Sequence, residues 1–193
     1  LRALVMSVQG QLLRIYGLPY MVALLVAPEI FAFLFGLDWR VAGQVTQLLV
    51  PWLLVRSLSN PLAPVARAAG KLGTGLIFEV VLVVLRVGGL VLGGLMGSPL
   101  LTVGLFSAGA TIGILLKLVW LLSLSQVSIL ELVRNNLSYV VHVLGLGGFG
   151  FGLKLYASSF TFWGYCVFLT LYAIYSSVNA LRSGIRVSEF EQP

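Results

Sequence analysis

Four charged side chains lie inside long apolar stretches of the sequence, and these residue types could do chemistry there: Arg56, Glu79, Arg86 and Lys117. On insertion scales, a charge at the centre of a bilayer costs about 2.5 to 3.5 kcal/mol. A charged residue in such a position is therefore expected to pair, to face a water-filled cavity or to bind an ionic ligand.

Arg86 is the principal candidate among the four. It falls near the middle of its apolar stretch, with no acid expected at a comparable depth. Glu79 lies two helical turns away on the same face, about 10.5 Å along the axis, which is too far for direct pairing. Arg86 therefore needs an anionic ligand, a wet cavity or a carboxylate from another part of the protein, and guanidinium groups suit bidentate contact with phosphate.

The other candidates are Arg56, Glu79, Lys117 and His142, and most of them could have either a structural or a functional role. Arg56 and Glu79 could pair across a helix hairpin, because Glu79 lies about 9 Å into its stretch from the same side; such a pair could be structural or could bind substrate. Lys117 is predicted to extend its stem towards the interface beside Trp120. His142, the single histidine, could relay protons or hydrogen-bond a neighbouring helix.

The elements that must position these residues are transmembrane helices. The chain of 193 residues is 59% hydrophobic and only 9% charged, against about 25% charged residues in a soluble domain. Apolar runs of about 20 residues, the length that crosses the hydrocarbon core, predict an all-α bundle of six spans. They cover residues 15–35, 41–62, 74–96, 100–122, 137–153 and 160–180.

Glycine and proline modify several of these spans. Gly89, Gly93 and Gly97 form a small-residue pattern that predicts close helix packing beside Arg86. The fifth span is the least regular prediction, since five glycines lower its helix propensity and it could bend or cross only partly. Kinks are expected in the first two spans, which carry the prolines Pro19, Pro28 and Pro51.

Turn chemistry separates the spans at 36–40, 69–73, 97–99, 123–136 and 154–159. The longest connection, 123–136, suits either a short amphipathic interfacial helix or an ordinary loop. With the N-terminus in the cytoplasm, seven basic residues fall on the cytoplasmic side (Arg2, Arg14, Arg67, Lys71, Arg134, Arg182 and Arg186) and two on the other (Arg40 and Lys154). This asymmetry predicts that both termini are cytoplasmic.

Several function classes are disfavoured. The basic residues are scattered and form no nucleic-acid patch. The single cysteine, Cys166, and single aspartate, Asp38, leave no cysteine metal site and no recognisable catalytic set. We therefore expect no enzyme activity, no metal and no cofactor.

The region from Arg14 to Val65, followed by Glu79 and Arg86, resembles the polysaccharide flippases of the multidrug/oligosaccharidyl-lipid/polysaccharide exporter superfamily. The residues that carry this resemblance are, in order, Arg14, Leu18-Pro19, Ala27-Pro28-Glu29-Ile30-Phe31, Leu34-Phe35-Gly36, Asp38-Trp39, Ala42-Gly43 and Leu48-Leu49-Val50-Pro51-Trp52. The resemblance is most specific over this helix pair and weaker beyond Gly97.

The resemblance implies a transporter that flips a polyprenyl-diphosphate-linked oligosaccharide across the bacterial inner membrane by alternating access. It implies substrate contacts by Arg86, Arg56 and Glu79, with Lys117 and His142 as secondary candidates. The chain is then expected to be a C-terminal piece without the first lobe, in which residues 14–125 complete the second lobe and residues 126–193 add two spans and a cytoplasmic tail. Expected partners are the missing lobe, a polysaccharide polymerase and glycosyltransferases.

Other interpretations stay open. Another exporter of the same superfamily, such as a cation-coupled drug antiporter or a peptidoglycan-precursor flippase, would differ in intramembrane acids upstream of this sequence. A membrane-embedded glycan-modifying enzyme would need a large extracytoplasmic loop, and none is predicted between these spans. In a passive assembly subunit, Arg86 would face a partner helix.

Overall fold

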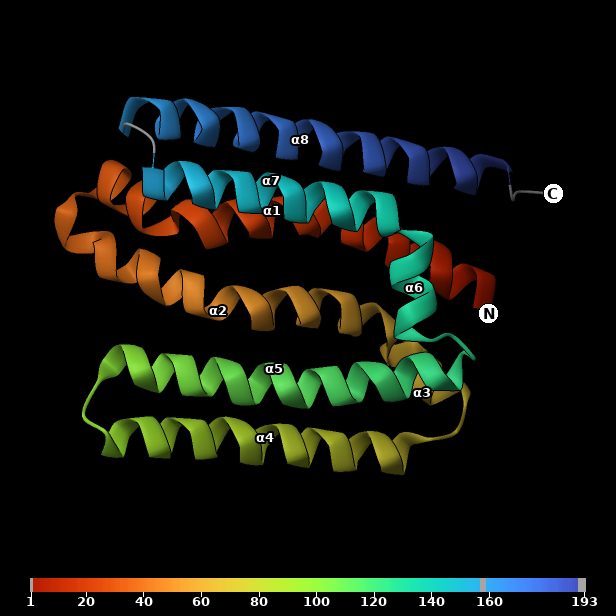
Figure 1. The fold of residues 1–193 in the computed structure, drawn as a ribbon. Coiled ribbons are helices and arrows are strands. Elements are labelled where there is room, and N and C mark those ends of the chain that lie inside the picture. The colour runs from red at the N-terminus through yellow and green to blue at the C-terminus, as the bar shows by residue number, and fades with distance from the viewer. Residues whose placement is uncertain (1, 157–158, 191–193) are drawn as a thin grey trace.

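The computed structural model describes residues 2–156 and 159–190, with side chains for 2–156 and 163–180. These residues form helices and their connections, with no strand among them (Figure 1). The elements are α1 (Arg2–Phe35), η1 (Leu37–Trp39), α2 (Arg40–Ser59), η2 (Asn60–Leu62), α3 (Ala63–Ala68), α4 (Leu72–Leu95), α5 (Pro99–Leu124), α6 (Ile129–Asn135), α7 (Leu137–Tyr156) and α8 (Ser159–Phe190).

The prediction of an all-helical bundle is confirmed for the described residues, and its apolar helices are consistent with membrane embedding. In the described part of the chain, five segments are long and apolar enough to cross a bilayer: Arg2–Phe35, Leu37–Ala68, Leu72–Leu95, Pro99–Leu124 and Leu137–Tyr156. They match the first five predicted spans. The sixth, 160–180, lies within the 32-residue helix α8, where the side chains of 160–162 are outside the described residues, and it stays a prediction.

Three of the predicted connections turn at a glycine. Gly36, Gly70 and Gly97 have φ angles of 101°, 65° and 69°, which residues with a Cβ rarely adopt. Each therefore ends a helix and allows the chain to reverse. Gly97 lies in the turn after α4, and a Cβ added there would have no neighbour within 4 Å, so the predicted small-residue packing surface consists of Gly89 and Gly93 alone.

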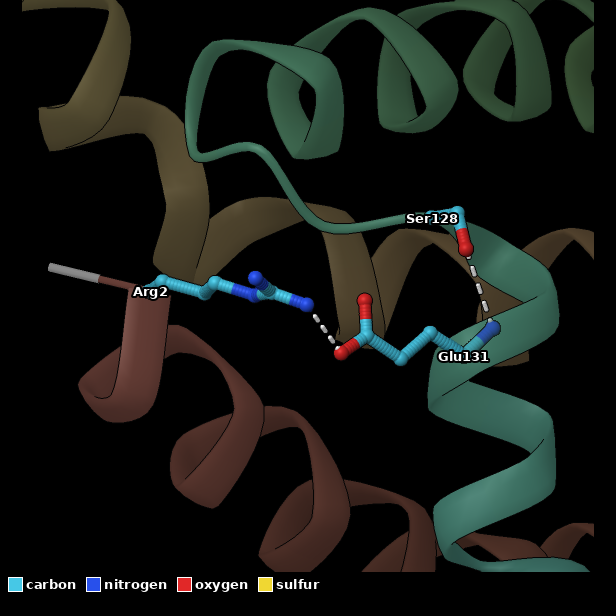
Figure 2. A network of polar contacts seen from close by, with 3 residues as sticks. All are labelled: Arg2, Ser128 and Glu131. Atoms are coloured by element: carbon cyan, nitrogen blue, oxygen red, sulfur yellow. Dashed lines mark hydrogen bonds and ion pairs between the residues drawn. The ribbon is translucent and has the colours of Figure 1, made fainter.

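The longest predicted connection contains a short helix, α6. A short helix was one of the two interpretations of this segment, and an ordinary loop was the other. Ser128 caps it by accepting a hydrogen bond from the Glu131 N–H at 3.0 Å, and Leu132 is its buried residue. The Glu131 carboxylate forms an ion pair with Arg2 at the start of α1 (Figure 2). This contact links α6 to the first turn of α1.

Helix α1 is the centre of the bundle. Side chains of neighbouring helices donate hydrogen bonds to the two carbonyls that its prolines leave without a partner. Proline lacks the N–H that would bond the carbonyl four residues earlier. The Ser177 hydroxyl donates to the carbonyl of Ile15, freed by Pro19, at 3.0 Å, and the Gln47 amide donates to that of Leu24, freed by Pro28, at 2.6 Å. The two carbonyls that the prolines leave free in α1 thus accept hydrogen bonds from α8 and α2.

The glycines of α7 do not interrupt it. Helix α7 runs unbroken for 20 residues, so the glycines that were predicted to weaken the fifth span do not break the helix. Gly147 lies against Met21 of α1, and Gly150 lies against Tyr165 of α8. Small residues therefore allow close packing with both neighbours.

The helices form two groups joined by α1 (Figure 1). On one side, α2, α5 and α4 lie side by side in that order; on the other, α7 and α8 cover α1. One buried apolar cluster joins the end of α2 and the following η2 to the end of α5 through Leu58, Leu62 and Leu121. The other joins α1 to α7 and α8 through residues such as Leu18 and Leu169. The candidate site lies in the α2–α5–α4 group.

Candidate functional site

Two arginines from different helices converge on one aromatic ring, that of Trp52. Arg56 follows Trp52 by one turn on α2, and its Cζ lies 5.3 Å from the ring centroid. Arg86 comes from the middle of α4, and its Cζ lies 5.6 Å from the same centroid. Both distances are within the range of a cation–π interaction. We call Trp52, Arg56 and Arg86 the arginine–tryptophan cluster.

Arg86 reaches Trp52 because α4 packs closely on α5, which lies between α4 and α2 (Figure 1). A Cβ at Gly89 would come within 2.6 Å of the Leu105 carbonyl oxygen, and one at Gly93 within 2.3 Å of the Thr102 Cα. Only glycine permits this separation. From α5, Phe106 meets the Trp52 ring edge-on, with centroids 5.6 Å apart and planes at 77°.

The cluster is rich in hydrogen-bond donors and short of acceptors. Among the described residues, the buried Nε of Arg86 and the buried Nε1 of Trp52 have no hydrogen-bond partner. Both groups are donors only. Arg56 is exposed and Arg86 is half-buried, and two positive charges with two unpartnered donors around one ring suit an anionic acceptor.

Glu79 does not join this cluster. It pairs with Lys117 of α5, and the predicted Arg56–Glu79 pair is wrong. The reason is the helix order: α5 separates α2 from α4, so the cation that meets Glu79 comes from α5. Lys117 is therefore half-buried in an ion pair, where the sequence predicted a side chain extending to the interface.

The Glu79–Lys117 pair borders a cavity of about 370 Å³ between α3, α4 and α5. Arg67 and Trp120 also line it. The Trp120 ring stacks on Phe78 with centroids 4.9 Å apart. The structure thus divides four of the predicted site residues, with Arg56 and Arg86 in the arginine–tryptophan cluster and Glu79 and Lys117 at this cavity.

His142, the remaining candidate, lies elsewhere. It is exposed on α7, with its ring 5.5 Å from that of Tyr172 on α8. Helix α7 packs mainly against α1, α6 and α8, on the side of the bundle away from α4 and α5 (Figure 1). The structure therefore does not bring His142 to the residues proposed to bind substrate.

Two features of the structure were not predicted from the sequence. Trp52 belongs to the family pattern, and its spacing of four from Arg56 predicts contact between the two side chains on a helix. Glu29 was not counted as a charge within a span, yet its Oε1 lies 3.0 Å from the Lys154 Nζ. That ammonium also donates to the Leu25 carbonyl at 2.9 Å. Counting every charge within residues 15–35 would have found Glu29.

The arginine–tryptophan cluster can bind an anion electrostatically. Its ring and guanidinium groups offer no nucleophile or general base, and within residues 2–156 and 159–190 no three His, Cys, Asp or Glu residues gather as metal ligands. No protein-family model, curated protein or solved structure matches the chain.

Proposed function

We propose that this chain is part of a transporter that flips polyprenyl-diphosphate-linked oligosaccharides across the bacterial cytoplasmic membrane for polysaccharide biosynthesis, by alternating access through a cationic cavity. The observation that carries the proposal is the convergence of Arg56 and Arg86 on Trp52. The sequence resemblance to polysaccharide flippases supports the choice of cargo.

The depth of Arg86 makes its charge difficult to explain without a ligand. Arg86 lies about 21 Å along α4 from its first residue and about 13 Å from its last. In a bilayer with a hydrocarbon core about 30 Å thick, this position is far from both interfaces. Stacking on Trp52 stabilises the guanidinium in part, but it leaves Nε without an acceptor.

A diphosphate fits the cluster better than a neutral or cationic cargo. Two guanidinium groups around one ring repel each other, and this repulsion is strongest where water is scarce. A phosphate oxyanion between them would replace the repulsion with charge-assisted hydrogen bonds. The same cations would lower the cost of carrying the diphosphate across the hydrocarbon layer, which is prohibitive without compensation.

Replacing Arg86 tests the proposal. In cells that depend on this protein for polysaccharide export, Arg86→Ala should reduce export at least about tenfold, because a charge-assisted hydrogen bond is worth about 1.5 to 3 kcal/mol. Arg86→Lys should be intermediate, since it keeps the charge and loses bidentate contact. Export is measured as surface polysaccharide per unit of membrane-inserted protein.

Arg40→Ala is the matched control, because Arg40 is an exposed cation at the start of α2, outside the cluster. It should leave export near the unmodified level. Unmodified export by Arg86→Ala at normal protein levels would overturn the proposal.

A further inference from the structure

The cavity between α3, α4 and α5 is a second place where cations meet an apolar surface. Its volume is about 370 Å³. Arg67, Lys117 and Glu79 supply its charges, and Trp120, Leu76 and Leu121 are among its apolar and aromatic walls. A soluble anion would use only the charged part of this lining. An anion attached to a hydrocarbon chain would use both parts.

The Glu79–Lys117 ion pair in this cavity is unevenly exposed. The Lys117 side chain is 20% exposed, whereas that of Glu79 is 54% exposed. The ammonium is therefore fixed within the bundle on α5, and the carboxylate is the partner that can turn away into solvent or headgroups. Lys117 needs an anion at this depth. That anion can be exchanged for another.

The cavity and the arginine–tryptophan cluster are linked by two helices, because α4 carries residues of both sites and α5 carries residues that contact both. Glu79 and Arg86 lie two turns apart on one face of α4, a separation of about 10.5 Å along the axis. On α5, Phe106 touches the cluster and Lys117 touches the cavity. A head group that moved from one site to the other would follow a single face of the α4–α5 hairpin.

We infer that this cavity is the capture site for the diphosphate of the lipid carrier, with Lys117 exchanging the Glu79 carboxylate for a phosphate oxygen. The inference rests on the proposed function and adds a binding site that the carrier occupies before it reaches the arginine–tryptophan cluster. Arg67 supplies a second positive charge at the cavity. The polyprenyl chain lies over Leu76, which is 67% exposed and opens the cavity towards the bilayer.

The inference predicts changes of opposite sign for the two members of the pair. In lipid nanodiscs containing the chain, Glu79→Gln should raise the affinity for polyprenyl diphosphate about fivefold, because Lys117 no longer has a competing carboxylate. Lys117→Met should lower it by a similar factor, and the double variant should behave like Lys117→Met. Affinity is measured by titration with polyprenyl diphosphate, following the fluorescence of Trp120 after Trp39 and Trp163 are replaced by Phe. The same titration of a Trp120→Phe variant gives the signal of Trp52, which is subtracted.

Arg134→Gln is the matched control. Arg134 is an exposed cation in the last turn of α6 and does not line the cavity, so its loss should change affinity by less than about twofold. A purely structural ion pair would give the same direction of change for Glu79→Gln and Lys117→Met. That result, or no change in either, would overturn the inference.

Two competitors define the ligand. Inorganic diphosphate and phosphatidylglycerol should each compete more weakly than polyprenyl diphosphate, and equal competition by either one would overturn capture of the carrier at this cavity. Failure here is distinguishable from failure of the proposed function. If Lys117→Met has no effect while Arg86→Ala still abolishes export, only the capture site is wrong.

Discussion

The indole of Trp52 makes contact with two arginines that lie on different helices. The ring is half-buried, receives the edge of Phe106 and lies near both guanidinium carbons at 5.3 and 5.6 Å. Removing it would leave two like charges without the aromatic surface that holds them in place. The stability of the bundle should therefore depend on this ring.

Shortening Trp52 in two steps measures that dependence. Trp52→Phe keeps an aromatic face and should lower the free energy of unfolding by about 1 kcal/mol, whereas Trp52→Leu removes it and should cost about 2 kcal/mol. Unfolding in mixed micelles with increasing sodium dodecyl sulfate, followed by far-ultraviolet circular dichroism, provides the measurement. Trp39→Leu is the control, because Trp39 is exposed in the α1–α2 connection. Equal losses for Trp52→Leu and Trp39→Leu would contradict a special role for the Trp52 ring.

At this scale, the sequence showed which charged residues require an interaction within the membrane better than it showed which residue supplies it. Arg86 could be identified as a cation within a membrane span from its distance to the ends of an apolar run. Its contact with Trp52 could not be predicted, because that contact depends on α5 lying between α2 and α4. The same helix order explains why Glu79 pairs with Lys117 and not with Arg56.

At the scale of the elements, the α4–α5 hairpin owes its close packing to individual glycines. Gly93 meets the backbone of Thr102, while a Cβ added at its neighbour Gly94 would have no atom within 4 Å. The two positions lie on the same helix and differ in what a methyl group would encounter. They offer a direct comparison of packing with intrinsic helix preference.

Adding one methyl group at each position should therefore give different results. Gly93→Ala should destabilise the hairpin by about 2 kcal/mol, because its Cβ would lie 2.3 Å from the Thr102 Cα and the helices would have to separate. Gly94→Ala should be neutral or slightly stabilising, since alanine favours helix more than glycine does. Thermal unfolding of the two purified variants in the same detergent decides the matter. Similar midpoints for both would show that α5 adjusts freely.

Element boundaries were largely predictable, because a change in hydropathy and a turn-forming glycine coincide at Gly36, Gly70 and Gly97. The start of α1 was not. The apolar run begins near Ile15, yet the helix begins at Arg2. The additional turns include buried Gln9, whose amide donates to the Leu58 carbonyl at 2.9 Å. Hydropathy locates the hydrocarbon region and does not register a helix that continues beyond it.

At the scale of the whole molecule, the connections divide between the two ends of the bundle. The start of α1, the end of α8, and helices α3 and α6 lie at one end (Figure 1). The α1–α2 and α4–α5 connections, the end of α7 and the start of α8 lie at the other. Basic residues concentrate at the first end, including Arg2 on α1, Arg67 on α3 and Arg134 on α6. Arg40 and Lys154 lie near the second. The arrangement of connections therefore agrees with the grouping of charges used to predict orientation.

Orientation is testable with two single-cysteine variants. After Cys166 is replaced by Ser, Asp38→Cys places a thiol in the exposed α1–α2 connection and Asn135→Cys places one on the exposed end of α6. A membrane-impermeant maleimide added to intact spheroplasts should label residue 38 and reach residue 135 only after the membrane is permeabilised, because the more basic end is retained in the cytoplasm. The reverse pattern would invert the predicted topology, and labelling of both thiols in intact spheroplasts would contradict a bundle whose two ends face opposite sides of the membrane.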